Sequence, residues 1–133
     1  MADHAFLKGE FVAAAALGRG VLVALDGSGD IVAADADSAT ASITKAIGAL
    51  AQPVAIGEQC YIYGGGRVPV LAGGTIAIGD LVKVEADGSG HALAAAPDMA
   101  SGTTEARCVG VALANASDGD MVLVDWAPSF ILE

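Results

Sequence analysis

Apolar residues occupy every second position in several short segments of the chain. Val or Leu alternates with more variable residues over positions 21–25, 81–85 and 121–125. An apolar period of two is typical of a strand that buries one face. Asp-Gly pairs at 26–27 and 87–88 follow two of these segments, and such pairs favour tight hairpins because glycine adopts positive φ. The pattern therefore predicts strands joined by hairpin turns.

Helix signals are weak by comparison. Only residues 39–51 could form a short helix, and Gly48 and Pro53 interrupt it. Residues 67–71 form an apolar segment between glycine clusters, and Pro69 within it predicts a strand at a sheet edge. Many short strands separated by turn signals are typical of a β-sandwich or a small barrel. We therefore predict an all-β, single-domain β-sandwich or small barrel with little helix.

The two halves of the chain resemble each other. The aligned pairs are 16–23 with 77–84, 26–29 with 87–90, 47–48 with 109–110, and 56–62 with 118–124. A fixed order of matched turns and strands indicates an internal duplication, with copies at about 12–63 and 74–125. This predicts an N-terminal arm over residues 1–11, a duplicated β-domain over 12–125 and a C-terminal apolar tail over 126–133.

Composition predicts that the chain associates with itself. Hydrophobic residues make up 54% of the 133 residues but aromatic residues only 5%, so a single core would consist mainly of Ala and Val. Small side chains bury little apolar area each, and an oligomer supplies further burial. Most aromatic residues lie in the two ends, where they either contact another chain or simply cap the sheet. The candidate contacts with a capsid or another copy are Phe6, Leu7, Phe11, Trp126, Phe130, Ile131 and Leu132.

Charge and cysteine content exclude several classes of function. Six Lys and Arg face 16 Asp and Glu, which gives a net charge of −10. Phosphate binding needs clustered cations, and an anionic membrane repels an acidic chain, so we expect neither nucleic acid nor membrane as a partner. Two cysteines provide no disulfide framework and no zinc spacing; Cys60 and Cys108 are predicted to be small buried residues.

No set of residues predicts catalysis or ligand chemistry. His4 and His91 lie far apart in sequence, and neither cysteine has a base nearby in the sequence. Residues 26–30 carry oxygen-bearing side chains, but Ile31 stands where an EF-hand loop needs glycine and Asp37 where it needs the terminal glutamate. Gly64–Gly66 lacks the Gly-Lys-Ser/Thr ending of a phosphate loop and is predicted to be a flexible link. We expect no enzyme, no catalytic or metal residues and no cofactor.

One alternative is a carrier of the biotinyl or lipoyl type, or another small β-sandwich binding module. Carrier domains are also small duplicated β-folds, and residues 79–86 resemble their strand before the attachment hairpin. Where those domains place the modified lysine, this chain has Asp87-Gly88, and Lys83 lies within the predicted strand.

From about residue 12 to 124 the chain resembles a family of small proteins that decorate or cement the capsids of tailed bacteriophages. Relatives have sometimes been labelled as recombinases related to RecA, but this chain lacks a phosphate loop, a basic surface and the length of an ATPase core. The phrases that carry the resemblance are residues 18–23, 46–48 with 56–58, 67–70 with 77–82, and 109–114 with 119–124.

The resemblance implies a structural virion protein, made in the host cytoplasm, that binds the outside of the expanded capsid. There it would stabilise contacts between subunits of the major capsid protein. Relatives form trimers or sometimes dimers, so a homotrimer is favoured over a dimer. Multivalent docking on a repeating lattice converts weak single contacts into strong avidity.

Overall fold

A computed structural model describes residues 4–7, 9–35, 46–98, 100–102 and 105–133. Within these residues the chain forms strands and turns and no helix, which confirms the predicted all-β class. Residues 48–50, part of the segment that could have been helical, form a strand, and 39–45 lie outside the description. The strands are β1 (His4–Phe6), β2 (Phe11–Val12), β3 (Leu22–Leu25), β4 (Ile31–Ala33), β5 (Gly48–Leu50), β6 (Gln59–Cys60), β7 (Ile62–Leu71), β8 (Leu81–Val84), β9 (Ala92–Ala94), β10 (Glu105–Ala112) and β11 (Met121–Leu132).

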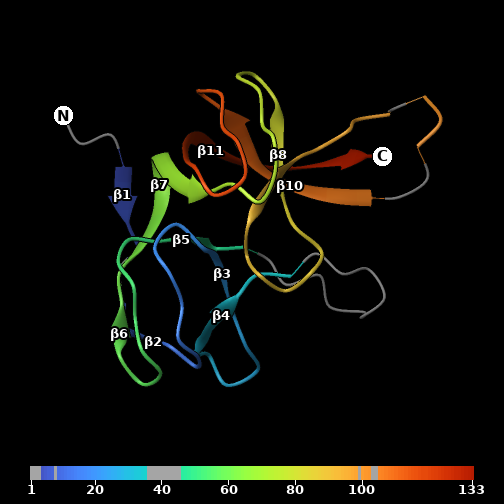
Figure 1. The fold of residues 1–133 in the computed structure, drawn as a ribbon. Coiled ribbons are helices and arrows are strands. Elements are labelled where there is room, and N and C mark those ends of the chain that lie inside the picture. Colours follow the sequence, from blue (N-terminus) through green and yellow to red (C-terminus); the bar gives the residue numbers. More distant parts are fainter. Residues whose placement is uncertain (1–3, 8, 36–45, 99, 103–104) are drawn as a thin grey trace.

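One curled sheet contains nine of these strands, in the order β4-β3-β5-β7-β11-β10-β8-β9, with β1 paired to β7. β2 and β6 form a separate two-stranded sheet. Figure 1 shows that the curled sheet gathers into two lobes, joined by β7, which crosses from one to the other. We call residues 4–66 the first half and residues 67–133 the second half.

The same backbone hydrogen bonds recur in both halves, as expected for a duplication. In each half, two turn glycines donate their N–H groups to carbonyls of the opposite segment. The matching bonds are Gly20–Leu50 with Gly79–Ala112, and Gly57–Ala13 with Gly119–Ala72.

The structural match makes Gly20 the counterpart of Gly79, whereas the sequence alignment made Gly18 the counterpart of Gly79. Leu25 pairs with Ile31 and Val84 with Ala92, so five residues (26–30) close the first hairpin and seven (85–91) the second. Because the sequence alignment superimposed the two Asp-Gly-Ser-Gly turns, it placed the preceding strands two residues out of register with the structural match.

The segment of β7 that contains Pro69 pairs with β11 and with no other described strand, which agrees with the predicted edge position. The first part of β7 pairs with β5 and β1. The predicted flexible link at Gly64–Gly66 is wrong, because these residues lie within β7. A Cβ on Gly64 would collide with the Leu7 side chain. The glycine leaves room for Leu7, which packs on the sheet there.

The described part of the predicted N-terminal arm belongs to the fold. The β2–β6 pairs Phe11–Cys60 and Val12–Gln59 match the β7–β11 pairs Val70–Val122 and Leu71–Met121. Phe11 and Val12 are thus the first-half counterparts of Val70 and Leu71 at the end of β7. The predicted C-terminal tail is likewise continuous with β11, which pairs with β10 as far as Leu132.

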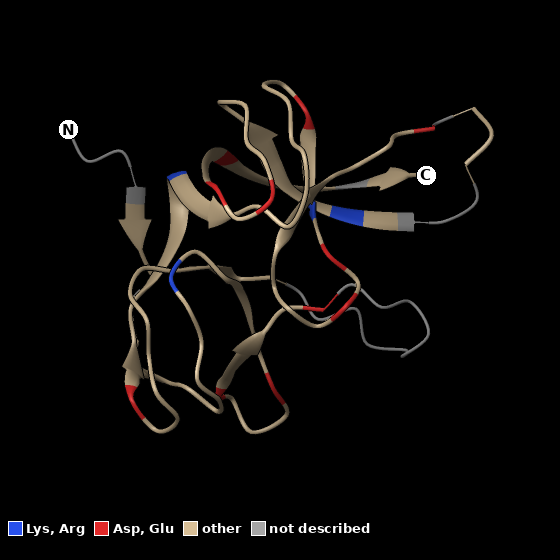
Figure 2. Cartoon of the chain, in the orientation of Figure 1, with Lys and Arg blue, Asp and Glu red and all other residues tan. Residues whose placement is uncertain are grey.

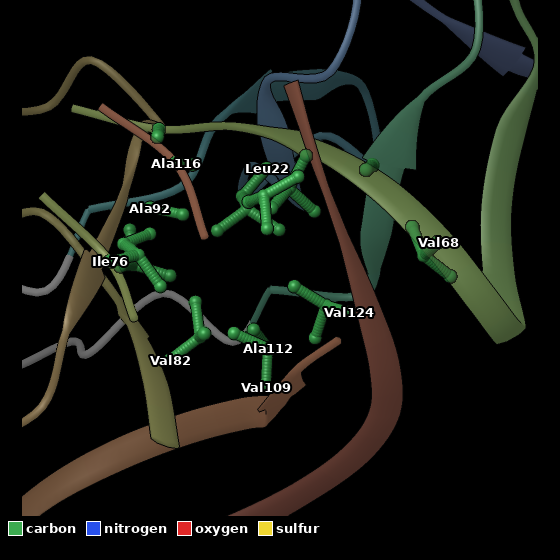
Figure 3. Packing of buried hydrophobic residues seen from close by; sticks show 14 of the residues in the cluster. Leu22, Val68, Ile76, Val82, Ala92, Val109, Ala112, Ala116 and Val124 are labelled. Atoms are coloured by element: carbon green, nitrogen blue, oxygen red, sulfur yellow. The ribbon is translucent and has the colours of Figure 1, made fainter. Parts of the chain in front are cut away.

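Two clusters of buried residues form the core. The smaller lies inside the first half and includes Val21, Val23 and Ile31. The larger fills the second half but also takes Leu22 and Ala24 from β3. Strand β3 is therefore buried on both faces, and Figure 3 shows Leu22 among residues of the second half. This contact packs the two halves into one body.

Candidate functional site

The described residues contain no cluster of His, Cys, Asp and Glu that could hold a metal ion. They also include no helix with the length and apolarity needed to cross a membrane. His4 lies in β1 opposite Gly66, and its side chain lies outside the description. His91 lies in the second half with Nδ1 3.7 Å from Glu85 Oε2. The two histidines therefore belong to different halves of the fold.

Both cysteines are buried free thiols, as predicted: Cys60 is 2% exposed and Cys108 is fully buried. Burial raises the pKa of each thiol, with a further contribution from Glu58 at Cys60 and from Glu133 at Cys108. A thiol held in its protonated form is a poor nucleophile, so both cysteines act as apolar core residues.

The two Asp-Gly-Ser-Gly segments form hairpin turns organised by their aspartates. Asp26 Oδ1 accepts the N–H groups of Ser28 and Asp30. Asp87 Oδ1 accepts the N–H and hydroxyl of Ser89, and these hydrogen bonds lower the pKa of Asp87. These carboxylate oxygens thus hold the turns themselves.

The positive φ predicted for the Asp-Gly pairs occurs at only one of them. Gly88 has φ +77°, whereas in the first hairpin the positive φ of +83° is at Gly29 and not at Gly27. Gly29 follows Leu25 by four residues, as Gly88 follows Val84, so the positive φ occupies the same place after each strand.

Gly-Asp and Gly-Glu pairs mark a second kind of turn. In residues 55–58, 77–80 and 117–120 the third residue is a glycine with positive φ, as in a type II turn. The acid that follows accepts the N–H of the first turn residue through Glu58 Oε1, Asp80 Oδ2 or Asp120 Oδ2. These acids are structural. The turns leave Ile56 73% exposed and Ile78 64% exposed.

A shallow hollow of about 270 Å³ lies between two of these turns, beside Ile76 and Ala116. Two of its polar groups already hold the backbone, because Asn115 Oδ1 accepts the N–H of Ile78 and Asp120 Oδ2 that of Ser117. The hollow therefore has little to offer a polar ligand.

The predicted contact residues are spread over both ends of the molecule. Phe6 is 52% exposed, and its ring stacks on Tyr63 with centroids 4.7 Å apart. Leu7 and Phe11 are half-buried against the smaller core cluster, and Trp126 against the larger one. Phe6 thus offers far more surface to a partner than the other three.

The remaining predicted contacts lie at the far end of the β10–β11 pair. Ile131 is 8% exposed, and Leu132 is half-buried opposite Glu105. Phe130 pairs with Arg107, and its side chain lies outside the description. The structure does not bring the seven residues together.

The second half also has an apolar surface whose residues are not among the predicted contacts. Val122 and Val124 point into the core, so Met121 and Leu123 point outward, 39% and 42% exposed. The outward row continues across β10 and β8 through half-buried Val111 and Leu81, which pair with each other. We call this surface the outer face; it consists of Pro69, Leu81, Val111, Leu113, Met121 and Leu123. A signal was present in the sequence, since the residues between the alternating positions, Met121 and Leu123, are themselves apolar.

Acidic residues gather elsewhere. Figure 2 shows Asp and Glu mainly in the turns that connect strands. Asp125 borders the outer face, where it pairs with Val111 on β10 and with Arg67 on β7. The apolar surface therefore has a pair of opposite charges at one border.

Lys83 is a half-buried residue of β8 that forms an ion pair with Glu133. Its Nζ lies 2.8 and 2.9 Å from the two carboxylate oxygens of Glu133. Partial burial opposes ionisation of Glu133, but the hydrogen bonds from Lys83 and from the Ala96 N–H lower its pKa. A lysine engaged within β8 is unlike the modified lysine of a carrier domain, which stands free at a hairpin.

Of the comparisons with known proteins, the comparison with solved structures gives a match. No protein-family model and no curated protein sequence matches the chain. Among solved structures, the chain is similar to the N base of the head fiber protein gp8.5 of bacteriophage phi29, with a TM-score of 0.64. The two share a fold. The match covers 92% of this chain and 95% of that chain at 20% sequence identity. It therefore includes both halves of this chain and shows a common fold.

Proposed function

We propose that this chain is a non-enzymatic structural protein of a phage virion that binds the outside of the expanded capsid and cements contacts between subunits of the major capsid protein. The observation that carries the proposal is the shared fold with the N base of a phage head fiber over nearly the whole of both chains. The family resemblance of the sequence supports the same role independently.

The surface chemistry is consistent with a binding protein. Polar groups in the turns and in the hollow hold the chain's own backbone, while apolar side chains such as Phe6, Leu123 and Ile56 stand exposed. Exposed apolar side chains rimmed by polar residues are typical of protein-binding surfaces. Repetition over a capsid lattice multiplies modest contacts of this kind.

The proposal is tested by adding purified protein to expanded capsids that lack it. We expect binding at a fixed number of copies per capsomer and a higher temperature of shell rupture, because a ligand that prefers the intact lattice stabilises it. Unexpanded capsids serve as the control and should bind less. A protein that neither binds its cognate expanded shells nor changes their rupture temperature would overturn the proposal.

A deletion of residues 1–11 is not a suitable test of the candidate contact residues at the N-terminal end. That deletion removes β1 and the Leu7 side chain that packs at Gly64, so it would damage the fold. Phe6→Ser changes an exposed side chain and keeps the strand. We expect weaker shell binding, with the free energy of unfolding lowered by only about 1 kcal/mol because the contact of the Phe6 ring with Tyr63 is lost.

A further inference from the structure

The part of the outer face around Leu81 and Val111 has a buried counterpart in the first half. Leu22 pairs with Ala49 in the way that Leu81 pairs with Val111. The carbonyl of Leu22 accepts the N–H of Ala34, and the carbonyl of Leu81 accepts the N–H of Ala95. The two sets of residues therefore occupy the same places in the repeated fold.

Their environments differ. Leu22, Ala34 and Ala49 are fully buried, because the second half covers that side of β3. Leu81, Val111 and Ala95 are only half-buried, and the adjacent Leu113 is 38% exposed. A surface that is a packed contact in one copy of the repeat is thus open in the other.

The surface that receives β3 in the second half also has an equivalent in the first half, and the two equivalents differ in burial. In the second half Val84, next to its hairpin turn, is 5% exposed and belongs to the cluster that receives Leu22. Its counterpart Leu25, next to the first hairpin turn, is 44% exposed. In the first half, therefore, no segment of the chain covers the surface at Leu25 in the way that β3 covers the surface at Val84.

We propose that a second copy of the chain completes this contact, head to tail, with its first half at Leu25 seated on the outer face of the first copy at Leu81, Val111 and Leu113. The contact repeats between molecules the packing that joins the two halves within one molecule. Lys83 stands in the place of buried Ala24, and its ion pair with Glu133 means that the contact covers a paired charge and not a free one. Such a heterologous interface closes into a ring if its rotation allows.

Two charged substitutions, one on each side of the interface, test the proposal in the isolated protein without any capsid. We expect the wild type to sediment as an oligomer and Leu113→Asp and Leu25→Asp each to sediment as monomers. An equimolar mixture of the two variants keeps one intact pair of surfaces and should form a heterodimer. Ile56→Asp is the matched control: Ile56 is 73% exposed, and its counterpart Asp118 is exposed too, so it lies outside the repeated contact.

Circular dichroism and urea midpoints check that the variants fold, and Leu113→Ser with Leu25→Ser replace them if the aspartates do not. A monomeric wild type at all concentrations overturns the inference. So does a Leu25 variant that stays fully assembled, since the outer face would then meet a second outer face or nothing. Equal disruption by Ile56→Asp also overturns it. These readouts do not depend on capsid binding, so the proposed function can fail while this inference stands.

Discussion

Replacing Leu22 by Ala should weaken the contact between the two halves of the chain. Leu22 lies in β3, is fully buried and packs with residues of the larger cluster. The substitution removes three carbons, worth about 2.4 kcal/mol in transfer free energy at about 0.8 kcal/mol each. A residual cavity raises the expected loss to about 3–4 kcal/mol.

The repeated fold supplies a matched control for this substitution. Leu81 occupies the equivalent position but is only half-buried, so Leu81→Ala should cost about 1 kcal/mol in the dilute protein. Urea denaturation followed by far-ultraviolet circular dichroism gives both free energies of unfolding. For a chain of 133 residues, a loss of about 3 kcal/mol corresponds to a fall in Tm of about 11 °C.

Equal losses for the two variants would refute the account of the core. They would mean that β3 does not join the halves and that Leu22 is no better packed than a residue on the open face. A loss at Leu81 that grows with protein concentration would instead show burial of the outer face on association.

Three further predictions concern turns, pH and thiols. Gly29→Ala should lower the free energy of unfolding by about 1 kcal/mol because Gly29 has positive φ, while Gly27→Ala should change it little, as thermal melts can show; similar effects at both sites would mean that the turn is misassigned. The lowered pKa of Glu133 makes its contribution, of order 1 kcal/mol, fully present above the ordinary glutamate pKa of about 4.3 and lost as the pH falls through the lower folded-state value. As the pH is lowered from 7 to 3, the urea midpoint should therefore fall less steeply for Glu133→Gln than for the wild type. Parallel curves would contradict the stabilising ion pair between Glu133 and Lys83. Both thiols should react with a maleimide only after denaturation, since each is buried with a raised pKa; rapid labelling of the native protein would show that the core opens.

The local features of this fold follow directly from the sequence. Alternating apolar positions predict β8 and the first part of β11, and the Asp-Gly pairs predict the two hairpins. Buried cysteines also follow, because Cys60 and Cys108 lie in apolar strand segments with no disulfide framework around them. These features depend on neighbouring residues alone.

The errors come from contacts between distant residues. Gly64–Gly66 looked like a linker because nothing near it in sequence shows that Leu7 packs there. The same limitation hid the double burial of β3, although residues 21–24 are apolar at every position. An uninterrupted apolar run can mean two buried faces, as in β3, or one buried face and one exposed face, as in the first part of β11. Only the tertiary fold separates these cases.

The central claim of cementing is tested most directly by a cryo-EM map of expanded capsids to which the protein has been added. The account predicts extra density on the outer surface that fits the two-lobed fold and touches at least two neighbouring subunits of the major capsid protein at each site. Density confined to a single subunit, density inside the shell, or none at saturating protein would contradict it.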